Sequence, residues 1–197
     1  MSFQNYDSFS ELVKTSRSVR RFSKGSGITR ELLTAFVDIA RYTPATANFQ
    51  PLKYKIFTEK SDLDDIFPRL KWAGLLKDKF VLQKYDERPE GYIAIFTDSN
   101  ILPHEKCGID VGICAQTIML AAKASGISGC ILAAFDKDAF AKSLSLPENL
   151  SPALILAFGK SAETITVEDA ENGRVAYYRD ENDVHHVPKR PISEIIF

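Results

Sequence analysis

Cysteine is scarce in this sequence, which has three cysteines among its 197 residues. Cys107, Cys114 and Cys130 are odd in number and lie in apolar stretches, a pattern that indicates a reducing compartment rather than a disulfide framework. Charge of one sign is also lacking, and the formal net charge of -1 gives no general attraction to nucleic acid. The N-terminus has neither the basic region nor the long apolar run of a signal peptide. We therefore expect a cytoplasmic protein without a nucleic-acid partner.

Sequence motifs of several common enzyme classes are absent as well. The stretch 24–27 lacks the Gly-Lys-Ser/Thr ending of a phosphate-binding P-loop, and no dinucleotide-binding glycine fingerprint follows a predicted strand. There is no Gly-x-Ser-x-Gly elbow of a hydrolase. The only groupings that resemble metal ligands are His104 with Cys107 and the pair His185 and His186, and neither has a second matching pair. We predict no metal site.

No apolar run is both long enough and uncharged enough to predict a transmembrane helix. The longest candidate, residues 107–126, is apolar nearly all the way round a helix. It barely reaches the ~20 residues of a bilayer span, and it contains Asp110 and Lys123. We therefore predict a buried core helix that continues into a subunit interface, and no membrane partner.

Apolar periodicity and capping residues predict the other elements. Helices are expected at about 8–15, 29–42, 62–70 and 137–144, with Ser8 capping the first, Thr29 the second and Asp136 the last. Buried strands are expected at 54–58, 92–97, 129–135 and 152–158. Since strands alternate with helices, the pattern favours an α/β arrangement around a central sheet. We expect a single domain over residues 1–197, with a partly mobile stretch at 77–90 and with Trp72 facing either a ligand or the core.

A basic loop lies between the first two predicted helices. Residues 16–22 contain three arginines and two serines, and the alternation around Val19 predicts an extended segment in which Ser18 and Arg20 share one side. Arginine is a good phosphate ligand because its planar fork makes paired, charge-assisted hydrogen bonds. The loop is therefore either an anion site or a solvated surface patch.

A second loop, residues 43–51, combines two stiffening prolines with small residues and two carboxamides. Asn48 and Gln50 can each donate and accept hydrogen bonds, as recognition of a flat heterocycle with mixed edges requires. The alternative is a rigid connector from a helix to a strand. At the other end of the chain, the tail of about 180–197 ends in apolar residues, and we expect it to dock on the body or on a partner, bringing Lys189 and Arg190 with it.

Three of these stretches, in the same order and spacing, resemble motifs of the FMN-dependent nitroreductase family. They are the basic loop 16–22, the loop 44–51 (PATANFQP) and the tail 188–196 (PKRPISEII), and the apolar central helix is similar too. The resemblance covers nearly the whole chain. It implies an α+β sandwich in which helices flank a central mixed sheet, and an intertwined homodimer with two FMN sites at its interface.

The resemblance also implies roles for particular residues. Arg17, Ser18 and Arg20 would hold the FMN phosphate, together with Lys189 and Arg190 of the tail. From the other subunit, the loop would reach the same flavin with the following residues: Pro44, Ala45, Thr46 and Asn48. The segment at Ala133 and Ala134 would offer a backbone N–H near flavin N5, and no catalytic side chain is implied. Two departures stand out: Ser16 replaces a basic residue, and Ala133-Ala134 replaces the Glu-Gly pair of some relatives.

The implied activity is oxidation of NADH or NADPH and reduction of a nitroaromatic, a quinone or a related small electrophile by a ping-pong mechanism. In that case FMN carries the hydride, and the protein binds and orients it. Three alternatives stay open. They are a flavin-binding sensor or carrier without turnover, a specialised flavin reaction such as reductive dehalogenation, and a dimeric interaction module that binds another anion.

Overall fold

The computed structural model describes residues 4–74 and 85–197. Its α-helices are α1 (Gln4–Thr15), α2 (Arg30–Ala40), α3 (Lys60–Ile66), α4 (Gly108–Ala124) and α5 (Lys137–Ser143). Its strands are β1 (Phe22–Ser23), β2 (Leu52–Phe57), β3 (Gly91–Asp98), β4 (Ser128–Leu132), β5 (Leu150–Ser161), β6 (Ile165–Asp169), β7 (Tyr178–Arg179) and β8 (His185–Lys189). The expected mobile stretch at 77–90 lies largely outside the described residues, and its described end holds a short 3₁₀ helix, Tyr85–Glu87.

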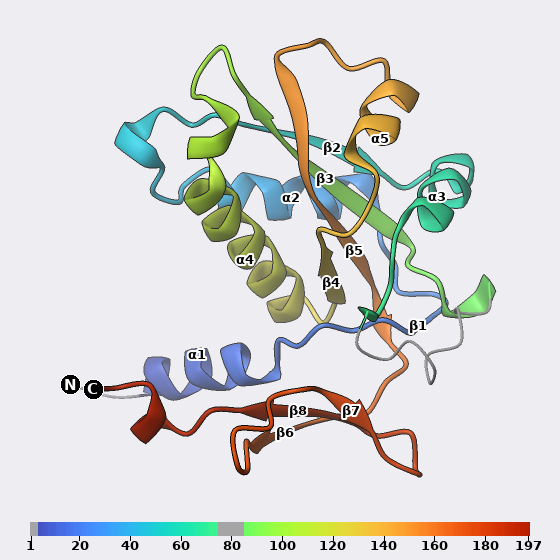
Figure 1. Cartoon of the computed structure of the whole chain (residues 1–197). Coiled ribbons are helices and arrows are strands. Elements are labelled where there is room, and N and C mark those ends of the chain that lie inside the picture. Colours follow the sequence, from blue (N-terminus) through green and yellow to red (C-terminus); the bar gives the residue numbers. More distant parts are fainter. Residues whose placement is uncertain (1–3, 75–84) are drawn as a thin grey trace.

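The main sheet has the order β1-β5-β3-β2, and β4 also pairs with β5 (Figure 1). All of these strand pairs are antiparallel. Parallel contacts occur at a single bridge between Ser18 and Gly129 and in the separate sheet β6-β8-β7. The fold is therefore α+β, as the resemblance implied. The α/β arrangement that the alternation favoured is wrong, because alternation of elements does not fix the direction in which strands pair.

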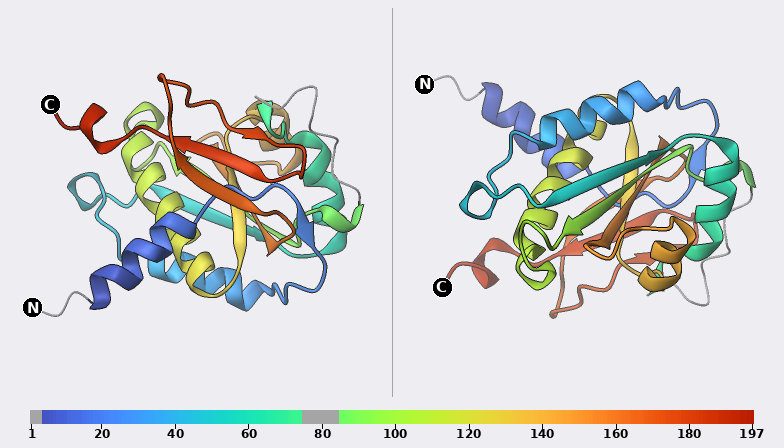
Figure 2. Two further views of the ribbon diagram at one scale, coloured as in Figure 1. Left: turned by 90° about the horizontal axis from the view of Figure 1, so that it is seen from below. Right: turned by 90° about the horizontal axis from the view of Figure 1, so that it is seen from above.

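Helices cover both faces of the main sheet, with α2 and α4 on one face and α3 and α5 on the other (Figures 1 and 2). Strand β3 lies between the two cores and is buried along its whole length. Its residues Ile93 and Ile95 pack toward α2 and α4, whereas Tyr92, Ala94 and Phe96 pack on the opposite side. This double burial explains why the strand is an unbroken apolar run in the sequence.

Several predicted element ends are confirmed by hydrogen bonds. Thr29 caps α2, since its hydroxyl oxygen accepts from the Leu32 amide at 3.2 Å, and Asp136 caps α5 by accepting from the Ala139 amide at 2.9 Å. The predicted Ser8 cap is wrong, because α1 already begins at Gln4, and no glycine or proline interrupts the helix before Ser8.

Two strands and one sheet differ from the expectation. β4 ends at Leu132 rather than 135, and β5 extends from Leu150 to Ser161 instead of covering only its apolar middle. The chain after Ser161, which has little apolar character, forms the three-stranded sheet β6-β8-β7 near the basic loop (Figure 1). A buried ion pair between Arg179 of β7 and Glu163 fixes this sheet to the segment that follows β5.

Helix α4 is buried on one face only. Its core face packs on the main sheet, whereas Ile109, 73% exposed, lies on a side that residues 4–74 and 85–197 leave uncovered. The expectation that this helix enters a subunit interface therefore stays a prediction. None of the helices within residues 4–74 and 85–197 is long and apolar enough to cross a membrane.

Candidate functional site

The basic loop is held in place by its backbone. The Val19 amide donates to the Gly129 carbonyl of β4 at 2.8 Å, and the Arg20 amide donates to the Glu163 carboxylate at 2.8 Å. Val19 itself is buried, so the loop runs extended along the end of β4, as the sequence predicted. Ser18 and Arg20 are thereby directed to the side opposite Val19.

A cavity of 350 Å³, which we call the basic cavity, opens on that side. It is lined by Ser16, Arg17, Ser18, Arg20, Gln116, Tyr177, His185, Val187 and Lys189. The fold thus brings Arg17, Ser18 and Arg20 together with Lys189 from the far end of the chain. Arg190 lies outside the lining residues, where its guanidinium is half exposed and pairs with Glu194 at 2.9 Å.

The basic cavity has a strongly positive lining. Among the described residues that line it, Arg17, Arg20 and Lys189 are cations, and none is acidic. The nearby carboxylate of Glu163 is paired with Arg179. The Arg20 guanidinium stacks over the Tyr177 ring, 4.9 Å from its centroid. Such a lining attracts an anion before any contact is made.

One arginine of the cavity retains unused hydrogen-bonding capacity. Arg17 donates from Nη2 to the Val13 carbonyl at 2.7 Å, but its Nε is buried without a partner among the described residues. Burial lowers the pKa of Arg17 from its ordinary value. A buried donor without an acceptor costs free energy, and a phosphate oxygen is the kind of acceptor that relieves this cost.

Sequence reasoning missed His185, Tyr177 and Gln116 as cavity residues. Burial, and next the charge of Arg20, lowers the pKa of His185 to about 4, so the imidazole is neutral near pH 7. A signal for His185 did exist: within β8, the alternate residues His185, Val187 and Lys189 share one face. All three line the cavity.

The second predicted loop, residues 43–51, has an unusual backbone. Ala47, Asn48 and Gln50 have φ of 45°, 58° and 53°, in the left-handed region that residues other than glycine seldom adopt. The buried carboxylate of Asp110 on α4 holds this turn, since its Oδ1 accepts from both the amide and the hydroxyl of Thr46 at 2.9 Å. A buried carboxylate on α4 thus anchors the loop.

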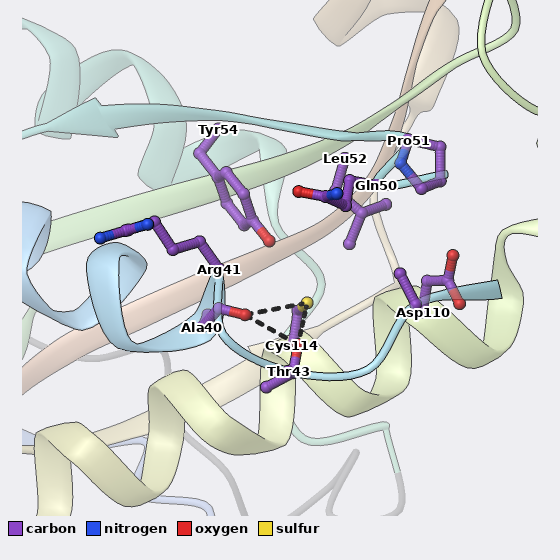
Figure 3. A pocket seen from close by; sticks show the side chains of 10 residues that line it. Ala40, Arg41, Thr43, Gln50, Pro51, Leu52, Tyr54, Asp110 and Cys114 are labelled. Atoms are coloured by element: carbon purple, nitrogen blue, oxygen red, sulfur yellow. Dashed lines mark hydrogen bonds between the residues drawn. The ribbon is translucent and has the colours of Figure 1, made fainter. Parts of the chain in front are cut away.

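A smaller cavity of 160 Å³ lies beside this loop (Figure 3). Its lining consists of Ala40, Arg41, Thr43, Ala45, Gln50, Pro51, Leu52, Tyr54, Asp110 and Cys114. Of the four loop residues expected to reach the flavin, Ala45 alone lines it, whereas Pro44, Thr46 and Asn48 are exposed. The loop contributes no residue to the basic cavity. Within one chain, the predicted loop residues therefore lie apart from the predicted phosphate-binding residues.

The remaining candidates lie at other places. Ala133 and Ala134 are exposed just after β4, the strand that the basic loop contacts, and the Ala134 carbonyl accepts from the Lys71 amide at 2.9 Å. Trp72 is partly buried and packs on the second core, with its ring centroid 5.7 Å from that of Phe67.

Two observations concern potentially reactive groups. Cys107, at the start of α4, is buried, and burial raises the pKa of its thiol, which disfavours a reactive thiolate. No cluster of three potential metal ligands exists within residues 4–74 and 85–197.

The fold and the basic cavity define an α+β protein with a site suited to a phosphate-bearing ligand. A model of the nitroreductase family matches residues 13–102 and 103–160, and the chain belongs to this family. The Bacillus subtilis (strain 168) protein YodC, provisionally named an NAD(P)H nitroreductase, is 22% identical over 180 residues, which cover 78% of this chain and 89% of that protein.

Solved structures show the same fold. The nitroreductase family protein from Streptococcus pneumoniae TIGR4 matches with a TM-score of 0.68 at 19% identity, over 96% of this chain and 98% of its own. A Desulfovibrio desulfuricans protein, provisionally named a nitroreductase and solved in complex with FMN, matches with a TM-score of 0.65 at 18% identity, over 95% of this chain and 94% of its own. The predicted nitroreductase-like sandwich is therefore confirmed.

The Asp110 anchor predicts a change in the stability of the loop. In Asp110→Ala, the Thr46 amide and hydroxyl lose their acceptor, at a local cost of about 1.4 kcal/mol or more. We expect chymotrypsin to cut after the exposed Phe49 roughly tenfold faster than in the unchanged protein, as mass spectrometry of the fragments would measure. Thr46→Val keeps the hydrogen bond from the backbone amide of residue 46 to Asp110 but loses the one from the hydroxyl, so this variant should be cut at an intermediate rate. Equal rates for all three proteins would contradict the anchoring role.

Proposed function

We propose that this protein is an FMN-dependent oxidoreductase that uses NADH or NADPH to reduce a nitroaromatic, a quinone or a related small electrophile. The observation that carries the proposal is the basic cavity, in which Arg17, Arg20 and Lys189 converge without an acidic neighbour in the lining. This donor set fits a phosphate monoester, and the unpartnered Nε of Arg17 supplies a further donor. Membership of the nitroreductase family supports the same reading.

The residues of this chain would bind and orient the cofactor. Arg17, Ser18 and Arg20 would donate to the phosphate, with Lys189 closing the cavity from β8. Strand β4 contacts Ser18 at Gly129, beside the cavity, and leads from there to the exposed residues Ala133 and Ala134. This segment would therefore lie beside the flavin ring and offer an N–H near N5. When bound, FMN supplies hydride acceptance from the nicotinamide and electron transfer to the second substrate.

A homodimer completes the proposed site. The exposed residues Pro44, Thr46 and Asn48, with the half-buried Ala45, lie on a loop that does not reach the basic cavity of its own chain. The apolar residues Ile196 and Phe197 at the C-terminus are exposed as well. In an intertwined dimer, the loop would cover the flavin held by the partner, and the tail would be buried. Arg190, next to Lys189, would then be able to reach the same phosphate.

Among the described residues, Ala133 and Ala134, which we place beside the flavin ring, have no side chain that could act as a fixed acid or base. Both substrates would therefore be held largely by contact with the flavin face. A ping-pong mechanism follows if the two substrates use this space in turn. The missing carboxylate also favours a second candidate, a flavin-binding sensor or carrier without turnover.

Replacement of Arg20 tests the phosphate site. We expect Arg20→Ala to weaken FMN binding by about 1.5–3 kcal/mol, the range for hydrogen bonds to a charged group, or roughly 10- to 150-fold in Kd. Quenching of flavin fluorescence during titration measures the affinity. Arg69→Ala is the control, since Arg69 pairs with Asp65 on the surface of α3. A folded Arg20→Ala protein with unchanged FMN affinity would refute the phosphate role.

Anaerobic reduction separates the two candidate functions. Protein loaded with FMN should lose its yellow absorbance when NADH or NADPH is added, and a quinone added afterwards should restore the colour. A flavin that binds tightly yet stays yellow with both nucleotides would rule out the oxidoreductase and leave the sensor or carrier.

A further inference from the structure

The basic cavity contains a buried histidine outside the arginine and serine motif. His185 begins β8 and is 2% exposed, and its Nδ1 is buried without a hydrogen-bond partner among the described residues. The ring lies edge-on to Tyr177, with the centroids 5.3 Å apart. A buried, unpaired nitrogen in the wall of a polar cavity is costly for folding alone. Its position is explained if a ligand completes its hydrogen bonds.

The charges that surround His185 keep it neutral in the ligand-free chain. After burial, the causes that lower its pKa are the positive charges of Arg20 on the basic loop, Arg179 on β7 and His186 on β8. The cations Arg17 and Lys189 line the same cavity. The carboxylate of Glu163 is paired with Arg179 and does not line the cavity, so the charge balance around the imidazole stays positive.

We propose that His185 is a further phosphate ligand of the basic cavity and that its imidazole takes up a proton from solvent when the phosphate binds. The proposal rests on the proposed FMN function. A phosphate monoester carries close to two negative charges near neutral pH, so it offsets the repulsion from the neighbouring cations. An opposite charge within a few ångströms favours the protonated histidine, which donates from both ring nitrogens.

The next residue provides a matched contrast. His186 points to the other face of β8, where its Nδ1 lies 2.8 Å from Glu168 and its Nε2 lies 3.4 Å from Asp180. These carboxylates raise the pKa of His186, and the residue does not line the cavity. His186→Asn therefore removes an imidazole from the same strand without changing the proposed phosphate contacts.

Isothermal titration calorimetry of FMN binding, carried out in two buffers of different ionisation enthalpy, gives the number of protons taken up per FMN bound. We expect a larger uptake by the unchanged protein and by His186→Asn than by His185→Asn, because the protonation of the phosphate itself is common to all three. His185→Asn should also bind FMN about tenfold more weakly near pH 6.5, and the difference should shrink toward pH 8. Equal proton counts in the unchanged protein and His185→Asn would overturn the proposal.

A second measurement needs no variant that might fail to fold. The chain has three histidines, so the Cε1–H resonances of the imidazoles give three titration curves by NMR. FMN should move the curve of lowest pKa upward. If FMN leaves all three curves unchanged, His185 does not take up a proton and the proposal is wrong.

The two proposals can fail separately. If the unchanged protein does not bind FMN at all, the proposed function fails, and phenyl phosphate, a monoester without a flavin, then serves as the probe. A proton uptake on binding phenyl phosphate that His185→Asn lacks would uphold the role of His185 as a phosphate ligand. No binding of phenyl phosphate, or equal uptake in both proteins, would overturn it.

Discussion

The hydrogen bond from the Val19 amide to the Gly129 carbonyl, 2.8 Å long, ties the basic loop to the main sheet. Together with the bond from the Arg20 amide to Glu163, it fixes an extended backbone in which every second side chain points the same way. Several positive charges are thereby held close together in one cavity before any ligand binds. Their mutual repulsion lowers the stability of the folded chain. In the proposed function, a ligand with two negative charges would bind a preformed site and lose less free energy to reorganisation.

Helix α4 separates the two halves of the proposed flavin site. Asp110 anchors the Thr46 turn, and Gln116, further along the helix, lines the basic cavity. Because an α-helix turns 100° per residue, these two side chains point in directions about 120° apart. One chain therefore presents its loop and its cavity on different sides. In the proposed homodimer, a second copy of the chain would resolve this separation, because its loop would cover the cavity of the first.

The elements that local pattern determines were predictable. The Thr29 and Asp136 caps, the buried β3 and the long α4 follow from spacing and from apolar runs that lie within one element. The motif residues Arg17, Ser18 and Arg20 line one cavity with Lys189, a grouping that came from family resemblance rather than from physical derivation, and Arg190 of the same predicted set lies outside that lining. Whether they hold a phosphate stays a prediction.

The features that depend on contacts between residues remote in sequence could not be predicted. The sheet β6-β8-β7 is made of short, largely polar strands, and it is stabilised by their pairing and by the Arg179–Glu163 ion pair across the fold. His185 carries only the weak alternation of a five-residue strand, and its position beside Arg20 emerges once that sheet has formed. The anchoring role of Asp110 likewise requires Thr46, which is remote in sequence.

The central claim is that each flavin is held by the basic cavity of one chain and the loop of another. The most direct test mixes Arg20→Ala with Asn48→Gly, which removes the carboxamide but tolerates the φ of 58°, and isolates the mixed dimer through two different affinity tags. A shared site predicts one FMN per mixed dimer bound with the affinity of the unchanged protein, because one cavity and its covering loop are both intact. A mixed dimer in which no FMN binds with that affinity would contradict the account.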